Sequence, residues 1–221
     1  MTKSTVNEIE RMVVTRVFDA PRELVWKAWT DPQYVKQWWG PKGFTAPCCQ
    51  MDFRVGGKFL YCMRAPDGQE FWNGGEYHEI VPHEKIVSSM YFADSKGNKV
   101  EPAQFGIEHE AIDGAHDVTL FEDLGNGQTK LTFIGNETMQ NAIQSGQLEG
   151  TKQILDKVAA VVAELALGGG EIRGSSLDDR HARDSERKAN AGPSRQPQPG
   201  VAAEALFKRA LVTWANRRLA G

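Results

Sequence analysis

The most constraining feature of this sequence is a series of short β-type segments that ends in one long helical segment. The segments combine β-branched and aromatic residues with alternating polarity, at 48–52, 58–64, 71–81, 85–92, 116–124 and 129–134. Turn sequences separate several of them, at Gly56-Gly57, Pro66-Asp67-Gly68, Pro82-His83-Glu84 and Gly125-Asn126-Gly127. Short connections of this kind join antiparallel neighbours. The series therefore predicts an antiparallel sheet.

Two short helices are expected before this series. A first strand occupies residues 9–18, and a helix-start sequence follows at Pro21. A second helix is predicted to begin at Asp31 and to end where Gly40 supplies a stop signal.

A long helix is expected to close the domain. Apolar residues recur at helical spacing across 137–166, although Gly146 and Gly150 interrupt the first half. At about 1.5 Å per residue this segment would span roughly 40 Å, enough to cross a whole sheet. The order of elements predicts an α+β fold with a curved antiparallel sheet of six to seven strands and helices on one face.

Composition changes sharply near Leu167 and divides the chain. Residues 1–167 are predicted to form the folded domain. Residues 168–200 contain too few large apolar side chains to offset chain entropy, which predicts a disordered linker. Residues 201–221 regain a helical pattern with basic residues, and a short basic amphipathic helix or tail is expected there. It could dock on a partner or membrane surface, fold back over the domain, or have no function.

Charge and composition limit the classes of function. Residues 1–166 carry 16 Lys and Arg against 23 Asp and Glu, a net charge of −7, whereas residues 167–221 carry +4. An acidic domain argues against a nucleic-acid partner. The sequence contains no apolar run near the roughly 18 residues of a membrane span. With its polar beginning, this predicts a cytoplasmic protein without a membrane span.

The cysteines indicate the same compartment. The chain has three, and Cys48 and Cys49 are adjacent, so they cannot easily bridge each other. A disulfide framework is therefore not expected, and a reducing cytoplasm fits best.

Several stretches together resemble a known family. They are RVFDAPRELVWKAWTDP at 16–32, Trp38-Trp39-Gly40-Pro41, DFRVGG at 52–57, Pro66-Asp67-Gly68 and VTLFEDL at 118–124. This ordered set resembles the START-like, or SRPBCC, superfamily, and within it the family named for the activator of heat-shock-protein-90 ATPase, in its stand-alone bacterial form. The resemblance implies the helix-grip fold, in which the sheet wraps around a long C-terminal helix. It also implies a cavity between them that holds hydrophobic ligands in the superfamily.

The candidate ligand-binding residues are aromatic and apolar side chains of the predicted strands and of the end of the second helix. Phe59, Tyr61 and Met63 alternate with Leu60, Cys62 and Arg64. The first three are expected to point inward, because the opposite choice would bury Arg64 without an evident partner. The same side chains could also simply fill a core. The predicted lining set is Trp38, Trp39, Phe59, Tyr61, Met63, Tyr77 and Phe121.

No sequence motif assigns catalysis, a metal or a cofactor. The chain contains no His-x-x-x-His or Cys-x-x-Cys spacing, P-loop, dinucleotide fingerprint or Gly-x-Ser-x-Gly elbow. No metal site, cofactor or catalytic residue is therefore predicted. The ionisable side chains that could serve acid–base chemistry in a cavity are Glu76, His78, Glu79, His109 and Glu110.

Three functions compete at this point. The first is binding of a small hydrophobic or amphipathic ligand between sheet and helix, whose exact role is unknown and for which a stress-related one is left open. The second is a co-chaperone-like interaction domain, with the chaperone contact that the family's name suggests. The third is a cyclase or hydrolase that uses a cavity-facing His or Glu. An exposed sheet edge could also pair two copies, so a homodimer is a further expectation.

Overall fold

The domain is built on one antiparallel sheet of seven strands in the order β1-β7-β6-β5-β4-β3-β2. A computed structural model describes residues 10–101, 103 and 114–168 of the chain. Neighbouring strands in the sheet are also neighbours in sequence, except that β1 pairs with β7. The strands are β1 (Arg11–Phe18), β2 (Thr45–Met51), β3 (Lys58–Arg64), β4 (Glu70–Val81), β5 (Lys85–Ala93), β6 (Asp117–Gly125) and β7 (Gln128–Thr138).

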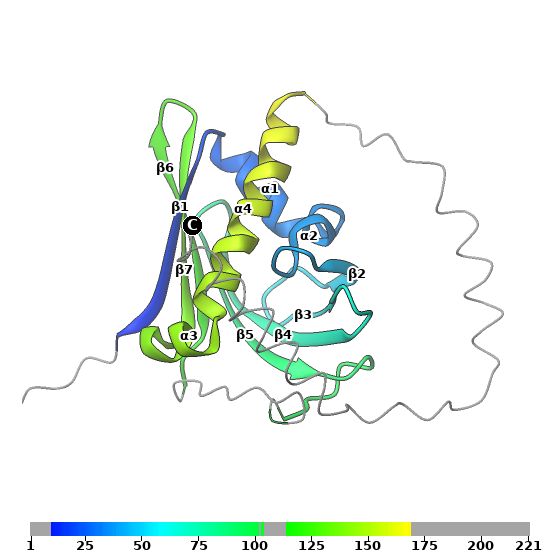
Figure 1. The fold of residues 1–221 in the computed structure, drawn as a ribbon. Helices are drawn as coiled ribbons and strands as arrows, with labels where there is room; N and C mark the ends of the chain where they lie inside the picture. Colours follow the sequence, from blue (N-terminus) through cyan, green and yellow to red (C-terminus); the bar gives the residue numbers. More distant parts are fainter. Residues whose placement is uncertain (1–9, 102, 104–113, 169–221) are drawn as a thin grey trace, which may run out of the picture.

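Helices cover one side of this sheet. They are α1 (Arg22–Thr30), α2 (Pro32–Trp38), α3 (Met139–Ser145) and α4 (Gln147–Ala166). Figure 1 shows α1, α2 and α4 together on the concave side of the curved sheet. The α+β architecture predicted from the order of elements is confirmed, and so is the helix-grip arrangement that the family resemblance implied.

The two short helices begin and end where local chemistry requires. Pro21 precedes α1, and Asp31 caps α2 by accepting a hydrogen bond from the backbone N–H of Gln33 at 3.0 Å. Pro32 occupies the first turn of α2, where its missing N–H costs nothing. Both helices were predicted from these same residues.

The C-terminal helical segment is broken, which corrects the expectation of one helix over 137–166. Gly146 adopts a left-handed conformation, with φ of 80°, and separates α3 from α4. Residue Glu137 belongs to β7, and Thr138 caps α3 through a 3.1 Å bond from the N–H of Asn141. The 20 residues of α4 span about 30 Å rather than 40 Å.

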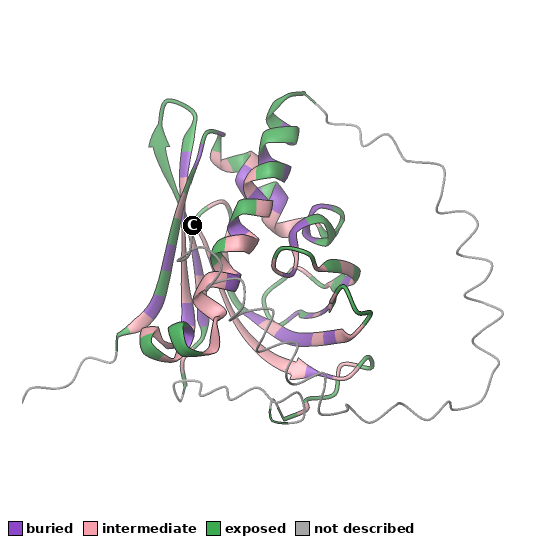
Figure 2. Ribbon diagram, in the orientation of Figure 1, coloured by how far each residue is buried: buried purple, intermediate pink, exposed green. Residues whose placement is uncertain are grey.

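The core lies between the concave face of the sheet and the helices. The inner stripe of α4 supplies Leu155, Val158 and Val162, each no more than 2% exposed. Met12 from β1 and Leu131 from β7 are completely buried beneath it. Figure 2 shows buried residues on both the strands and the helices that face one another.

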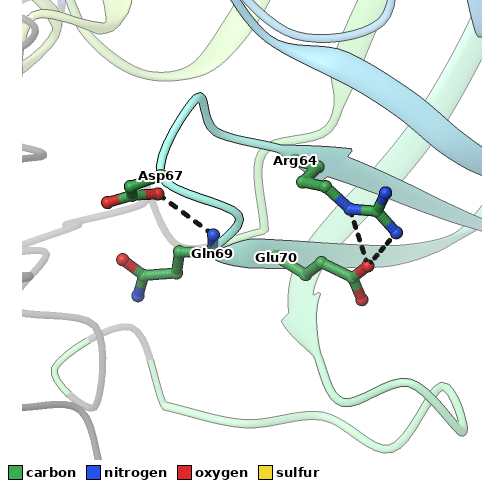
Figure 3. Close-up of polar contacts among 4 residues, drawn as sticks. All are labelled: Arg64, Asp67, Gln69 and Glu70. Carbon is green, nitrogen blue, oxygen red and sulfur yellow. Dashed lines mark hydrogen bonds and ion pairs between the residues drawn. The ribbon is translucent and has the colours of Figure 1, made fainter.

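The hairpin between β3 and β4 carries two polar contacts, one between the strands and one in the turn (Figure 3). Arg64 and Glu70 are directly opposed in register and form an ion pair at 2.6 Å. The carboxylate of Asp67 accepts a 3.0 Å hydrogen bond from the N–H of Gln69, which fixes the predicted turn.

This ion pair is expected to contribute little to stability. Replacing Arg64 with alanine should lower the free energy of unfolding by less than about 1 kcal/mol, because both side chains are partly exposed and solvent screens their charges. Urea denaturation of the two proteins measures the difference. A loss above about 2 kcal/mol would show that the pair has a structural role that its exposure does not suggest.

Several sequence predictions lie outside the described residues. They concern the linker, the basic tail, His109 and Glu110. The two edges of the sheet are β1 and β2, and pairing of two copies through either edge stays a prediction.

Candidate functional site

The register of the strands places two rows of side chains on the concave face of the sheet. Residues that are directly opposed on neighbouring strands share a face. One row across β2, β3, β4 and β5 consists of Cys49, Tyr61, Asn73 and Phe92. The adjacent row consists of Met51, Phe59, Gly75 and Met90. The buried state of Phe59 and Tyr61 and the exposed state of Arg64 match the orientation expected from the alternation.

Aromatic rings meet on this face in a group that we call the inner aromatic cluster: Trp39, Phe53, Phe59, Tyr61 and Tyr77. The ring of Tyr61 stacks on Phe59, with centroids 4.7 Å apart, and contacts Trp39 at 4.8 Å. The ring of Tyr77 lies 5.1 Å from both Phe53 and Phe59.

A glycine allows the cluster to lie against β4. A Cβ atom at Gly75 would stand 2.1 Å from the ring of Phe59 and 2.2 Å from the carbonyl oxygen of Ser89. No side chain fits at such distances, so Phe59 packs directly on the β4 backbone.

The two tyrosines of the cluster share a buried hydrogen bond. Their hydroxyl oxygens are 2.9 Å apart. Burial raises the pKa of Tyr61 and that of Tyr77 above the ordinary value, so both hydroxyls stay neutral. One hydroxyl donates to the other, and the acceptor keeps its own hydrogen for a further partner.

Two buried polar atoms beside the tyrosines lack a hydrogen-bond partner among the described residues. One is the amide oxygen of Asn73, a residue only 5% exposed and directly opposed to Tyr61. The other is the indole nitrogen of Trp39. Buried polar atoms are rarely left unpaired, because desolvation costs about 1–3 kcal/mol each.

The segment after α2 is held by α4. The ammonium group of Lys157 donates to the carbonyl oxygens of Gly40 at 2.9 Å and Phe44 at 3.3 Å. Its partial burial lowers the pKa of Lys157. Gly40 has a φ of 92°, and a Cβ there would lie 3.2 Å from the Cβ of Met63. The segment that follows Trp39 is therefore bonded to α4 and lies close to Met63 of β3.

The structure distributes six of the seven predicted lining residues between two aromatic groups, and the seventh, Met63, lies beside Gly40. Trp39, Phe59, Tyr61 and Tyr77 belong to the inner aromatic cluster. Trp38 stacks on Trp29 and donates its indole N–H to the carbonyl of Ala28 at 2.8 Å, so it packs between α1 and α2. Phe121 packs on Trp26 and Trp29 of α1. Ligand contact by any of them stays a prediction.

Sequence reasoning missed a pair of buried carboxyl groups. Glu137 is 1% exposed, and one of its carboxyl oxygens has no hydrogen-bond partner among the described residues. Burial, with the charge of Asp117 as a smaller cause, raises the pKa of Glu137 to about 7. Burial also raises the pKa of Asp117 to about 6, although this side chain accepts a 2.9 Å bond from the N–H of Asn136. Two inward carboxyls with raised pKa values mark a further candidate position for chemistry.

Three of the ionisable residues singled out from the sequence lie in the described part of the chain, and these three do not gather in this way. Glu79 is exposed and pairs with Lys85 at 2.7 Å. His78 is exposed and stacks on His116, with ring centroids 4.2 Å apart. Glu76 is partly buried.

The described part of the chain has neither a metal-binding cluster nor a membrane-spanning helix. No group of three or more His, Cys, Asp or Glu side chains there is arranged to hold a metal ion. No helix in the same part is long and apolar enough to cross a membrane.

Comparisons with known proteins give consistent results. A family model described as "Activator of Hsp90 ATPase homolog 1-like protein" matches residues 19–163. A solution structure of a protein from Arthrobacter aurescens is 28% identical, with a TM-score of 0.59 over 71% of this chain and 88% of the other. A crystal structure of a protein from Chromobacterium violaceum is 27% identical, with a TM-score of 0.55 over 69% of this chain and 96% of the other. A search of the curated proteins found no match.

Proposed function

The chain belongs to the activator of Hsp90 ATPase homolog 1-like family, and on that premise we propose that it binds a small amphipathic ligand between the concave face of the sheet and α4. The ligand's polar end would lie at Tyr61, Tyr77 and Asn73. Its apolar part would lie against the inner aromatic cluster. Two observations carry the proposal: the two tyrosine hydroxyls are paired, and Asn73, which is directly opposed to Tyr61 in the sheet, has an amide oxygen without a partner among the described residues.

The hydrogen-bonding groups favour one kind of polar end. The tyrosine pair offers one free O–H donor, and Asn73 offers one acceptor. A hydroxyl group of a ligand can accept a hydrogen bond from the free tyrosine O–H and donate one to the amide oxygen of Asn73. The burial that raises the pKa of Tyr61 also penalises a carboxylate placed beside it. The proposed ligand is therefore a neutral alcohol or phenol rather than a fatty-acid anion.

Partly covered apolar side chains favour the same location for the ligand's apolar part. Met51 and Met90 stand on the concave face beside Phe59, and neither is fully buried. Leu148 and Ile154 of α4 are also only partly buried. A ligand in contact with them would remove further apolar area from water, at about 25 cal/mol per Å².

A ligand pair of equal chain length tests this proposal. We expect 1-decanol to bind the full-length protein more tightly than decanoate, measured by quenching of tryptophan fluorescence above pH 7. Replacing Tyr77 with phenylalanine should weaken decanol binding about three- to tenfold, the effect of one lost hydrogen bond.

Tyr91→Phe is the matched control. Tyr91 lies beside Gly74 on the convex face, and its hydroxyl donates to the carbonyl of Gly97. Its removal should leave decanol affinity unchanged. Equal loss in both variants, or tighter binding of decanoate than decanol, would contradict the proposed polar end. No binding of either probe, and no co-purified ligand in native mass spectrometry, would contradict the proposed function itself.

A further inference from the structure

Two cysteines on the convex side of the sheet face each other across neighbouring strands. Cys48 of β2 and Cys62 of β3 are directly opposed in register, and both are free thiols. They point away from the concave face, because side chains alternate along a strand and the next pair, Cys49 and Tyr61, lies on that face. Cys49 is therefore separated from both by the sheet.

The backbone geometry brings Cys48 and Cys62 within reach of a disulfide. The N–H of Asp52 donates to the carbonyl of Lys58 at 2.9 Å, so these opposed residues form a hydrogen-bonded pair. Hydrogen-bonded pairs recur at every second residue along two antiparallel strands, so Cys48 and Cys62 also form a hydrogen-bonded pair. Cα atoms in such pairs are about 5.5 Å apart, inside the roughly 4.4–6.8 Å that a disulfide spans.

A small approach of the two strands would complete the bond. Opposed Cβ atoms in sheets lie about 4.5–5.5 Å apart, whereas a disulfide holds them at about 3.5–4.5 Å. Strand β2 is free to make this adjustment, because it forms an edge of the sheet and its register is already irregular between Thr45 and Cys48. The two thiols also interact electrostatically, since Cys48 contributes to the raised pKa of Cys62.

We propose that Cys48 and Cys62 form a reversible cross-strand disulfide in the presence of a disulfide oxidant such as glutathione disulfide. The thiolate of Cys48, the more exposed of the two residues, attacks one sulfur of glutathione disulfide and releases one glutathione. Cys62 then loses its proton, attacks the Cys48 sulfur and releases the second glutathione. The protein gives up two electrons and two protons, and the oxidant becomes two molecules of glutathione.

Two properties of this bond follow from its surroundings. Burial raises the pKa of Cys48 and raises that of Cys62 to about 12. Glu70 raises both pKa values further, whereas Lys36 lowers that of Cys48 and Arg64 lowers that of Cys62. Formation of the disulfide should therefore be slow near pH 7 and accelerate about tenfold per pH unit. The required approach of the strands leaves the bond strained, and strained disulfides are the ones that glutathione reduces readily. Oxidation would fix the edge strand β2 to β3.

Thiol counting in glutathione redox buffers tests the proposal. The full-length protein is equilibrated with glutathione and glutathione disulfide at about pH 8.5, quenched with acid, denatured and alkylated with N-ethylmaleimide. Intact mass then gives the number of free thiols. We expect the wild type to lose two of its three thiols without gaining glutathione.

Single-cysteine variants identify the pair. Cys49→Ala should oxidise like the wild type, and its digest should contain one peptide cross-linked between Cys48 and Cys62. Cys48→Ser and Cys62→Ala should form at least about tenfold less internal disulfide. The proposal is overturned if Cys48→Ser still loses two thiols, if oxidation yields linked dimers, or if the wild type stops at a glutathione adduct. Thermal melts show whether each variant is folded. If Cys48→Ser or Cys62→Ala does not fold, the cross-linked peptide in the Cys49→Ala digest still tests the proposed pair.

Discussion

Replacing Glu137 with glutamine is expected to stabilise the protein by about 3 kcal/mol at pH 8 and to change its stability little at pH 4.5. The pKa of Glu137 is raised from 4.5 to about 7 in the folded protein. Well below pH 4.5 the carboxyl is protonated in both states, and at pH 4.5 it is about half ionised in the unfolded chain only. As the pH rises toward 7, the unfolded chain releases this proton and the folded chain retains it. Stability therefore falls by about 1.4 kcal/mol per pH unit across this range.

Urea denaturation across this pH range measures the effect. Glutamine keeps the shape of the side chain and has no charge to desolvate, so the contribution of Glu137 to the decrease should disappear, most clearly between pH 6 and 7, above the pKa of Asp117. Asp117, whose pKa is about 6, should leave a smaller decrease at lower pH in both proteins. Glu164→Gln is the matched control, because this glutamate of α4 is exposed. Parallel pH profiles for the wild type and Glu137→Gln would show that Glu137 is ionised without penalty in the folded state.

The regular part of the fold could be predicted from the sequence because its signals are local. Alternating side chains and turn residues determine where strands lie, as with the hairpin around Asp67. The break at Gly146 was harder to place, because a glycine within a helical pattern can be tolerated or can end the helix. The extension of β7 to Thr138 depends on its pairing with Arg11, 127 residues earlier, which no local pattern contains.

The polar part of the candidate site illustrates a different limit. Glu137 continues the alternation of Leu131 and Phe133, so its inward direction was available from the period of two residues. A charged side chain is ordinarily assigned to the solvent side, and this preference concealed it. The contact between the hydroxyls of Tyr61 and Tyr77 had no such signal. It arises from the pairing of β3 with β4 and from where the two rings end on the concave face.

The adjacent tryptophans at the end of α2 should differ sharply when each is replaced by alanine. Trp38→Ala is expected to lower the free energy of unfolding by about 3–5 kcal/mol and the melting temperature by roughly 10 °C. The Trp38 side chain is 2% exposed and stacks on Trp29 with ring centroids 4.8 Å apart. Its indole N–H donates a hydrogen bond to the carbonyl oxygen of Ala28. Alanine would leave a cavity between α1 and α2 and an unpaired carbonyl.

Trp39→Ala provides the comparison within the same segment. The ring of Trp39 is only partly buried, and its indole nitrogen has no partner among the described residues. We therefore expect Trp39→Ala to lower the free energy of unfolding by less than about half as much as Trp38→Ala. Decanol affinity should nevertheless fall in Trp39→Ala, because this ring contacts Tyr61. Thermal melts and fluorescence titrations of both variants separate the two roles. If Trp39→Ala lowers stability as much as Trp38→Ala and leaves decanol affinity unchanged, Trp39 is a core residue and does not contact the ligand.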